Sequence, residues 1–240
     1  MIAKIQLERN YDTLRYFLDC MTLLYGQMGT GKTTNAVAMA YWMREMFGRP
    51  VICVGTTLGI KPPFGDYSYL TVKEFIEQFL LIDKISNEVR EEQISEQDLP
   101  RFLKFCQETR GLKLYNCILV VDEMYKYADA HRSSSPLTLA ITNFVDQMRH
   151  YHCAWIGMTP TIGRITNRLR DQIRWRCKPD EGPDRVYHLR FVGPHGVKVL
   201  TINGPDYAGK YPGDPEAMFD SWAFTGFNAK GLEKVLEKYV

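Results

Sequence analysis

The chain has 240 residues, of which 45% are hydrophobic and 24% are charged, and its formal net charge at pH 7 is +2. This length allows one good core with a small appendage, and the near balance of charges neither demands nor excludes a nucleic-acid partner. Since no stretch reaches the ~18 consecutive apolar residues of a membrane-spanning helix, no membrane insertion is expected. The six cysteines form no C-x-x-C pair, so we expect reduced thiols inside a cell.

Apolar runs that suit buried strands alternate with helical patterns along the chain. Buried strands are predicted at residues 21–25, 51–54, 116–121, 153–158 and 172–177. Helices are predicted at residues 32–47, 71–84, 98–111, 136–151 and 231–239. A β-hairpin is predicted at residues 186–192 and 197–202, and loops are predicted at residues 56–66 and 86–97.

This alternation predicts an α/β fold, in which helices cover both faces of a parallel sheet. Residues 1–180 are expected to form this core. Residues 181–240 are expected to form a C-terminal hairpin, an arm rich in aromatic side chains and a short helix, packed on the core or on a neighbouring subunit. Ligands of such sheets bind at the carboxyl ends of the strands.

Residues 26–33 match every fixed position of the pattern G-x-x-x-x-G-K-[ST]. They lie between a predicted strand and a predicted helix, which is the context that the pattern requires. The match predicts a P-loop NTPase (RecA-like) fold that binds ATP and Mg²⁺, with the Lys32 ammonium on the outer phosphates and the Thr33 hydroxyl on the metal. The residues expected to contact the nucleotide are Gly26, Gln27, Met28, Gly29, Thr30, Gly31, Lys32, Thr33 and Thr34.

The predicted strand at residues 116–121 ends in two carboxylates, Asp122 and Glu123. In a P-loop fold, Asp122 would hold Mg²⁺ beside the Thr33 hydroxyl. Glu123 would polarise an attacking water as a general base. The alternative is a solvated acidic strand end without a catalytic role.

The two motifs and the segments after them resemble the FtsK–HerA branch of P-loop ATPases, most closely viral genome-packaging ATPases and Zot-like proteins. Residues 120–124 resemble the Walker B strand of that group, and residues 147–159 resemble the step from a helix-ending arginine into the next strand. Residues 165–170 resemble the segment that follows. The resemblance covers roughly residues 21–177 and implies an ATPase that translocates DNA.

Members of this group form rings in which an arginine of one subunit reaches the γ-phosphate of its neighbour. The resemblance makes Arg149 the candidate for this arginine finger, with Arg164, Arg168 and Arg170 as rivals. The alternative role for Arg149 is a structural tie between helix and strand.

The group usually ends its fourth strand in a Thr-Gln sensor of the γ-phosphate. Here Thr159 is followed by Pro160, so Thr159 is the candidate sensor and the glutamine is missing. This departure keeps open a function with little turnover.

Double-stranded DNA, bound without sequence preference, is the expected partner. The loop after Glu123 offers the cationic candidates Lys126, His131 and Arg132, and Tyr125 and Tyr127 could pack on sugars or bases. The alternative is an ordinary polar loop.

The leading hypothesis is an ATPase that packages a viral double-stranded genome into a preformed capsid. It would act as a homo-oligomeric ring, a hexamer or a pentamer, at the capsid vertex, in the host cytoplasm or attached to the virion. One alternative is a Zot-like filamentous phage extrusion or plasmid-transfer ATPase. Another is a nucleotide-binding assembly switch, and a kinase is disfavoured because no acceptor-binding lid is evident.

Overall fold

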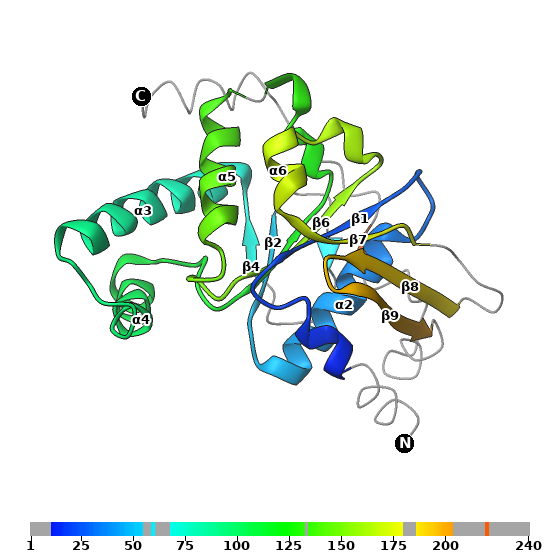
Figure 1. Cartoon of the computed structure of the whole chain (residues 1–240), viewed down its shortest axis with the longest axis horizontal. Coiled ribbons are helices and arrows are strands. Elements are labelled where there is room, and N and C mark those ends of the chain that lie inside the picture. Colours follow the sequence, from blue (N-terminus) through cyan, green and yellow to red (C-terminus); the bar gives the residue numbers. More distant parts are fainter. Residues whose placement is uncertain are drawn as a thin grey trace.

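An eight-stranded sheet lies at the centre of the computed structural model, which describes residues 11–54, 59–60, 68–132, 134–179, 186–203 and 219–220. The strand order is β4–β2–β5–β6–β1–β7–β8–β9 (Figure 1). The strands are β1 (Met21–Tyr25), β2 (Val51–Val54), β4 (Ser68–Leu70), β5 (Ile118–Val121), β6 (Ala154–Thr159), β7 (Ile173–Cys177), β8 (Val186–Gly193) and β9 (Gly196–Asn203). Neighbours from β4 to β7 are parallel, and β8 and β9 extend the sheet as an antiparallel hairpin. The predicted fold class is therefore confirmed.

The five predicted buried strands and the hairpin are all present, because apolar runs suit strands that are covered on both faces. The sequence did not predict β4, a three-residue edge strand in which Ser68 and Tyr69 are exposed and only Leu70 is buried. It also missed β3 (Gly59–Ile60), which pairs antiparallel with β10 (Phe219–Asp220). The rest of the predicted aromatic arm and the predicted helix at 231–239 lie outside the described residues.

Three of the described helices begin at a Thr or Ser side chain that accepts a hydrogen bond from one of their free N–H groups. α3 starts with a capping box, in which Thr71 Oγ1 accepts from the Glu74 N–H at 3.2 Å and Glu74 Oε2 accepts from the Thr71 N–H at 2.7 Å. Within the described ranges, no helix combines the length and apolar content needed to cross a bilayer. The α-helices are α2 (Lys32–Phe47), α3 (Val72–Glu91), α4 (Leu99–Arg110), α5 (Pro136–Gln147) and α6 (Asn167–Gln172), and the 3₁₀ turns are η1 (Met124–Lys126), η2 (Ala130–Arg132) and η3 (Ile162–Arg164).

Two helix ends differ from the prediction. α3 continues into the stretch that was expected to be a polar loop from residue 86. The continuation is stabilised by tertiary contacts, since Ile85 is buried and the Ser86 hydroxyl bonds to Gln147 Oε1 at 3.2 Å and to the Tyr151 hydroxyl at 2.9 Å. α5 ends at Gln147, earlier than predicted, and the chain then turns into β6.

Side chains alternate between two cores along the central strands. On β5, Leu119 and Val121 join one apolar cluster, and Ile118 and Val120 join the other. The second cluster is covered by α2. Figure 1 shows α3, α5 and α6 toward the top of the view and α2 toward the bottom, on the other side of the sheet.

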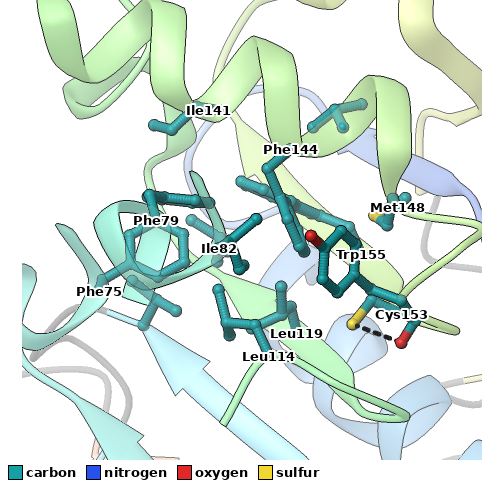
Figure 2. Close-up of a cluster of buried hydrophobic side chains, with 14 of the residues drawn as sticks. Phe75, Phe79, Ile82, Leu114, Leu119, Ile141, Phe144, Met148, Cys153 and Trp155 are labelled. Carbon is teal, nitrogen blue, oxygen red and sulfur yellow. Dashed lines mark hydrogen bonds between the residues drawn. The ribbon is translucent and has the colours of Figure 1, made fainter. Parts of the chain in front are cut away.

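Aromatic rings dominate the first cluster, which is drawn in Figure 2. The Trp155 ring of β6 lies 6.0 Å from the Phe75 ring of α3 and 6.2 Å from the Phe144 ring of α5. Each of these side chains is almost fully buried. Such contacts add about 0.5–1.5 kcal/mol per pair to the apolar burial, so they fix α3 and α5 on one face of the sheet.

Candidate nucleotide site

The loop between β1 and α2 adopts a backbone conformation that favours glycine at three positions. φ is +148° at Gly26, +82° at Gly29 and +72° at Gly31, in a region that other residues rarely adopt. The loop follows the carboxyl end of β1 and opens α2, whose first N–H groups have no partner within the helix. An anion in this loop would therefore meet backbone N–H groups and the positive end of the helix dipole.

The Lys32 ammonium folds back on this loop. Nζ donates to the carbonyl oxygens of Gly26 at 2.8 Å and Gln27 at 2.7 Å. Partial burial lowers the pKa of Lys32, and the Asp122 carboxylate acts in the opposite direction. Such an effect weakens with distance, so Asp122 is among the charges that lie near this amine. A phosphate anion beside Nζ would act in the same direction as Asp122.

The other predicted nucleotide-contacting residues line the same loop. The Thr30 hydroxyl donates to Gln27 O at 2.9 Å and tightens the turn. The Met28 side chain is 97% exposed, so only its backbone can serve a ligand inside the loop. Thr33 is half-buried in the first turn of α2, and the Thr34 side chain lies outside the described part of the chain.

The two carboxylates lie where β5 ends, and β5 is separated from β1 by one strand, β6. Asp122 Oδ1 accepts from the Glu123 N–H at 2.8 Å, which fixes the turn after the strand. Glu123 has φ +46°, in the left-handed region. Its carboxylate forms an ion pair with the Lys126 ammonium in η1. The predicted base is thus present at the correct edge, with a cation of its own chain against it.

Thr159 ends β6 beside the phosphate loop. It is in register with Tyr25, and its carbonyl oxygen accepts from the Gly26 N–H at 3.3 Å. Its hydroxyl is buried and donates to Thr161 O at 3.0 Å. The structure therefore brings the sensor candidate to the same edge as the loop and the carboxylates, with the hydroxyl already bonded.

The donor set suits Mg²⁺ that is shared with a nucleotide. A Thr33 hydroxyl and an Asp122 carboxylate are hard oxygen ligands, and Mg²⁺ is usually held by one or two such groups together with phosphates and waters. Among the described residues, no group of three or more His, Cys, Asp or Glu side chains could hold a metal by itself. The Thr33 and Asp122 oxygens suit a metal that arrives with phosphate.

Arg149 lies at the amino ends of the strands, on the side of the sheet opposite to the phosphate loop. It follows α5 and precedes β6, so the length of β6, roughly 16 Å at about 3.3 Å per residue, separates it from its own loop. The side chain is exposed, and Nε donates to His150 Nε2 at 3.4 Å. The described contacts include no tie from this side chain to β6.

Of the rival arginines, Arg164 lies nearest in sequence to the carboxyl end of β6. Arg164, in η3, follows β6 and places its guanidinium over the Tyr125 ring, 5.1 Å from the centroid. Arg168 is exposed in α6, and Arg170 donates to Asn167 Oδ1 in the same helix. Arg164 is thus the rival that contacts the segment after Glu123.

Two of the side chains expected to contact DNA have partners within the chain. Tyr127 is buried and lies 6.2 Å from the Phe75 ring, so it cannot stack on a base. Burial, with the charges of the two carboxylates, raises its pKa. Lys126 is paired with Glu123, and the Arg132 side chain lies outside the described residues.

Two residues near the loop were not predicted as site residues from the sequence. The buried Asn35 side chain donates to Gly31 O at 2.9 Å and fastens the loop to α2. Lys178 follows β7, the other parallel neighbour of β1, and its Cγ would lie 3.7 Å from a Cβ on Gly26. An asparagine within an apolar helix and a lysine just after a predicted strand were the available signals.

Comparisons with known proteins found the following similar structures. The N-terminal domain of zonular occludens toxin from Neisseria meningitidis is 18% identical, covers 78% of this chain and 96% of its own, and has a TM-score of 0.46. The genome packaging NTPase B204 from Sulfolobus turreted icosahedral virus 2, in complex with ATP-gammaS, is 12% identical, covers 76% of this chain and 97% of its own, and has a TM-score of 0.47. The pCW3 conjugation coupling protein TcpA with ATPgS is 11% identical, covers 92% of this chain and 65% of its own, and has a TM-score of 0.52.

Identities this low show the fold alone, and these are the kinds of protein that the resemblance in the sequence predicted. This chain spans about two thirds of the TcpA chain, at 65%. No match to the chain was found among curated protein sequences. The model of the ATPase family associated with various cellular activities (AAA) matches residues 22–178, and the chain therefore belongs to the AAA family of ATPases.

Proposed function

We propose that the chain is an ATP-hydrolysing DNA translocase that packages a viral double-stranded genome into a preformed capsid as a homo-oligomeric ring. The observation that supports the hydrolytic part is the hydrogen bond from the Gly26 N–H to the Thr159 carbonyl oxygen, together with the direct pairing of β6 with β5. The phosphate loop and the carboxylates after β5 thus follow the carboxyl ends of strands that both pair with β6. The packaging part is supported by the resemblance of residues 120–124, 147–159 and 165–170 to viral packaging ATPases.

Each residue of the site would have its own role in the reaction. Lys32 would exchange its two loop carbonyls for the outer phosphate oxygens, which are stronger acceptors because they are charged. Bound Mg²⁺, held by Thr33 and Asp122, would neutralise phosphate charge. Glu123 would take a proton from the attacking water. The Thr159 hydroxyl would leave Thr161 O to bond the γ-phosphate or the water.

Arg149 would act in a neighbouring subunit. An exposed arginine at the edge far from its own loop can reach a phosphate only across a subunit contact. In a ring built head to tail, such a contact repeats at every interface. DNA would then be gripped through its phosphates, without reading of the base sequence.

A steady-state ATPase assay with and without linear double-stranded DNA tests the proposal. Glu123→Gln should still bind ATP but lose about 10²- to 10⁴-fold in kcat, and Lys32→Ala should lose ATP binding. Glu77→Gln, which removes an exposed carboxylate of α3, is the matched control. Full turnover by either site variant contradicts the site.

The DNA arm of the same assay separates the functional classes. Stimulation by double-stranded DNA supports a translocase. Tight ATP binding with negligible turnover under both conditions would instead favour the nucleotide-dependent assembly switch. A membrane-anchored partner that purifies with the chain would favour the extrusion or plasmid-transfer ATPase.

A further inference from the structure

The hairpin of β8 and β9 extends the sheet beyond β7, toward the right of Figure 1, and its two faces differ. One face is buried in the apolar cluster that α2 covers, through Trp175, Cys177, Leu189, Phe191 and Leu200. Side chains of the other face alternate with these along each strand. The register pairs Arg176 with Val192 and Arg190 with Val199, so β7, β8 and β9 share this second face, which is exposed.

The exposed face carries four cations. Arg174, Arg176 and Lys178 occupy every second position along β7 and the residue after it, and Arg190 lies on the neighbouring strand β8. All four residues are exposed, and none of the described outward residues of these three strands is acidic. At about 3.3 Å per residue, the row along β7 is about 13 Å long. Each strand of a B-form duplex carries about four phosphates over this length.

Two of these cations are held in place by contacts within the chain. Arg174 Nη2 lies 2.7 Å from His195 Nε2 in the hairpin turn, and Arg176 Nη2 donates to Arg170 O in α6 at 2.8 Å. A guanidinium has five N–H donors, so each arginine keeps donors for an anion. Because part of the side-chain freedom is already lost, binding an anion costs less entropy.

Exposed apolar side chains lie beside the cations. Val192, Val197 and Val199 are 55%, 45% and 51% exposed. Apolar groups between cations suit the sugars of a nucleic-acid backbone. The described outward residues of the three strands include no Phe, Tyr or Trp on which the bases of a single strand could stack. A second copy of this same face would bring like charges together, which is unfavourable.

We propose that the exposed face of β7, β8 and β9 binds the phosphate backbone of double-stranded DNA without reading its base sequence. Tyr127 and Lys126, which were expected to contact DNA after Glu123, have partners within the chain, so a basic surface elsewhere is the better candidate. This face presents its cations from strands, which position side chains more precisely than loops do. The inference rests on the proposed function, because it takes duplex DNA as the partner.

Fluorescence anisotropy of a labelled duplex of about 30 bp, over roughly 0.05–0.3 M salt, tests this surface in the full chain. Arg174→Gln combined with Arg190→Gln removes two cations of the face. The affinity at about 0.1 M salt should fall by about 10-fold or more. The slope of log K against log salt concentration should become shallower by about 1.8, since each phosphate contact contributes about 0.9. Two duplexes of unrelated sequence should show the same losses.

A second double variant controls for the change in net charge. Arg101→Gln combined with Lys104→Gln removes two exposed cations of α4, which lies at the opposite side of Figure 1 from β8 and β9. The change in formal charge is the same, so an effect of net charge alone would appear in both double variants. We expect the α4 variant to keep the affinity and the salt slope of wild type.

The outcomes separate this inference from the proposed function. If wild type binds the duplex and the Arg174/Arg190 variant binds it with the same affinity and slope, the inference is overturned, and a translocase that grips DNA elsewhere survives. If wild type does not bind the duplex, the inference and the proposed translocase both fall. Loss of self-association in the variant, measured by light scattering, would instead make this face a contact between copies. If the double variant has a lowered melting temperature, Arg190→Gln alone replaces it, with an expected slope change of about 0.9.

Discussion

The Gly26 N–H donates to the Thr159 carbonyl oxygen across 3.3 Å, so the first residue of the phosphate loop is fastened to the last residue of β6. The loop therefore depends on its neighbouring strand as well as on its glycines. Any change that displaces Gly26 should therefore also affect the position of Thr159, the sensor candidate.

Gly26→Ala tests this dependence. A Cβ at φ +148° is strained, and it would lie 3.1 Å from Thr30 Oγ1. We expect ATP affinity to fall by about 10-fold or more, since strain of roughly 1–3 kcal/mol must be relieved by moving the loop. Isothermal titration calorimetry measures this. Gly163→Ala, whose Cβ would meet only Thr161 Oγ1 at 3.6 Å, is the control, and equal affinities in both variants would contradict the loop geometry.

Arg149 can be tested by mixing two inactive variants. Arg149→Ala lacks the proposed finger but keeps its base, and Glu123→Gln has the opposite defect. In random rings mixed in equal amounts, about one quarter of the sites pair an intact Glu123 with a neighbour's intact Arg149. We expect ATPase activity to reappear at about that level. Continued inactivity of the mixture would show that Arg149 has a structural role within its own subunit.

Gly193→Ala should destabilise the hairpin. An added Cβ would lie 2.4 Å from Trp175 Cε3 and 2.5 Å from Arg174 O, and neither atom is the end of a flexible side chain. We expect a loss of roughly 1–3 kcal/mol in the free energy of unfolding, as for other overpacked sites. Urea unfolding measures it, with Gly163→Ala again as the control. An unchanged midpoint would mean that β8 does not pack on β7 in this way.

Alkaline pH should destabilise the fold through its buried thiols. Burial raises the pKa of Cys20, Cys53 and Cys177 to about 12. The unfolded chain releases these protons near its ordinary thiol pKa of about 8.5, so it binds fewer protons than the folded chain between about pH 8.5 and 12. The free energy of unfolding should therefore fall as pH rises through this range, by up to roughly 1.4 kcal/mol per pH unit for each thiol.

Urea unfolding at pH 7, 9 and 10 checks the slope. Cys53→Ala should be less stable at pH 7, because it leaves a cavity, and its stability should fall less steeply with pH. The same slope in wild type and Cys53→Ala would contradict the contribution of this thiol.

Local patterns were sufficient to predict the parallel strands and the loop. β5 is apolar throughout because both faces of it are covered, and residues 26–33 carry their chemistry in their spacing. Tertiary contacts decided what the sequence left open. The hydroxyl of Ser86 keeps α3 helical through its bonds to α5 and Tyr151, and no pattern within α3 encodes those partners.

The roles around the site were harder to predict than the positions. From the sequence, Lys126 and Tyr127 are both expected to be exposed loop residues. In the structure, Lys126 pairs with Glu123 and Tyr127 packs against Phe75. This division depends on the direction of the 3₁₀ turn, which a single sequence does not specify. The roles of Arg149 and Thr159 in catalysis stay predictions.

The central place of β1 has a consequence for the order in which the chain folds. Its two partners, β6 and β7, are synthesised long after it, and until they are available β1 has no strand beside it. Contacts so distant in sequence form late, because closing the intervening loop costs entropy first. A chain still emerging from the ribosome should therefore gain its affinity for ATP only once β7 has been made.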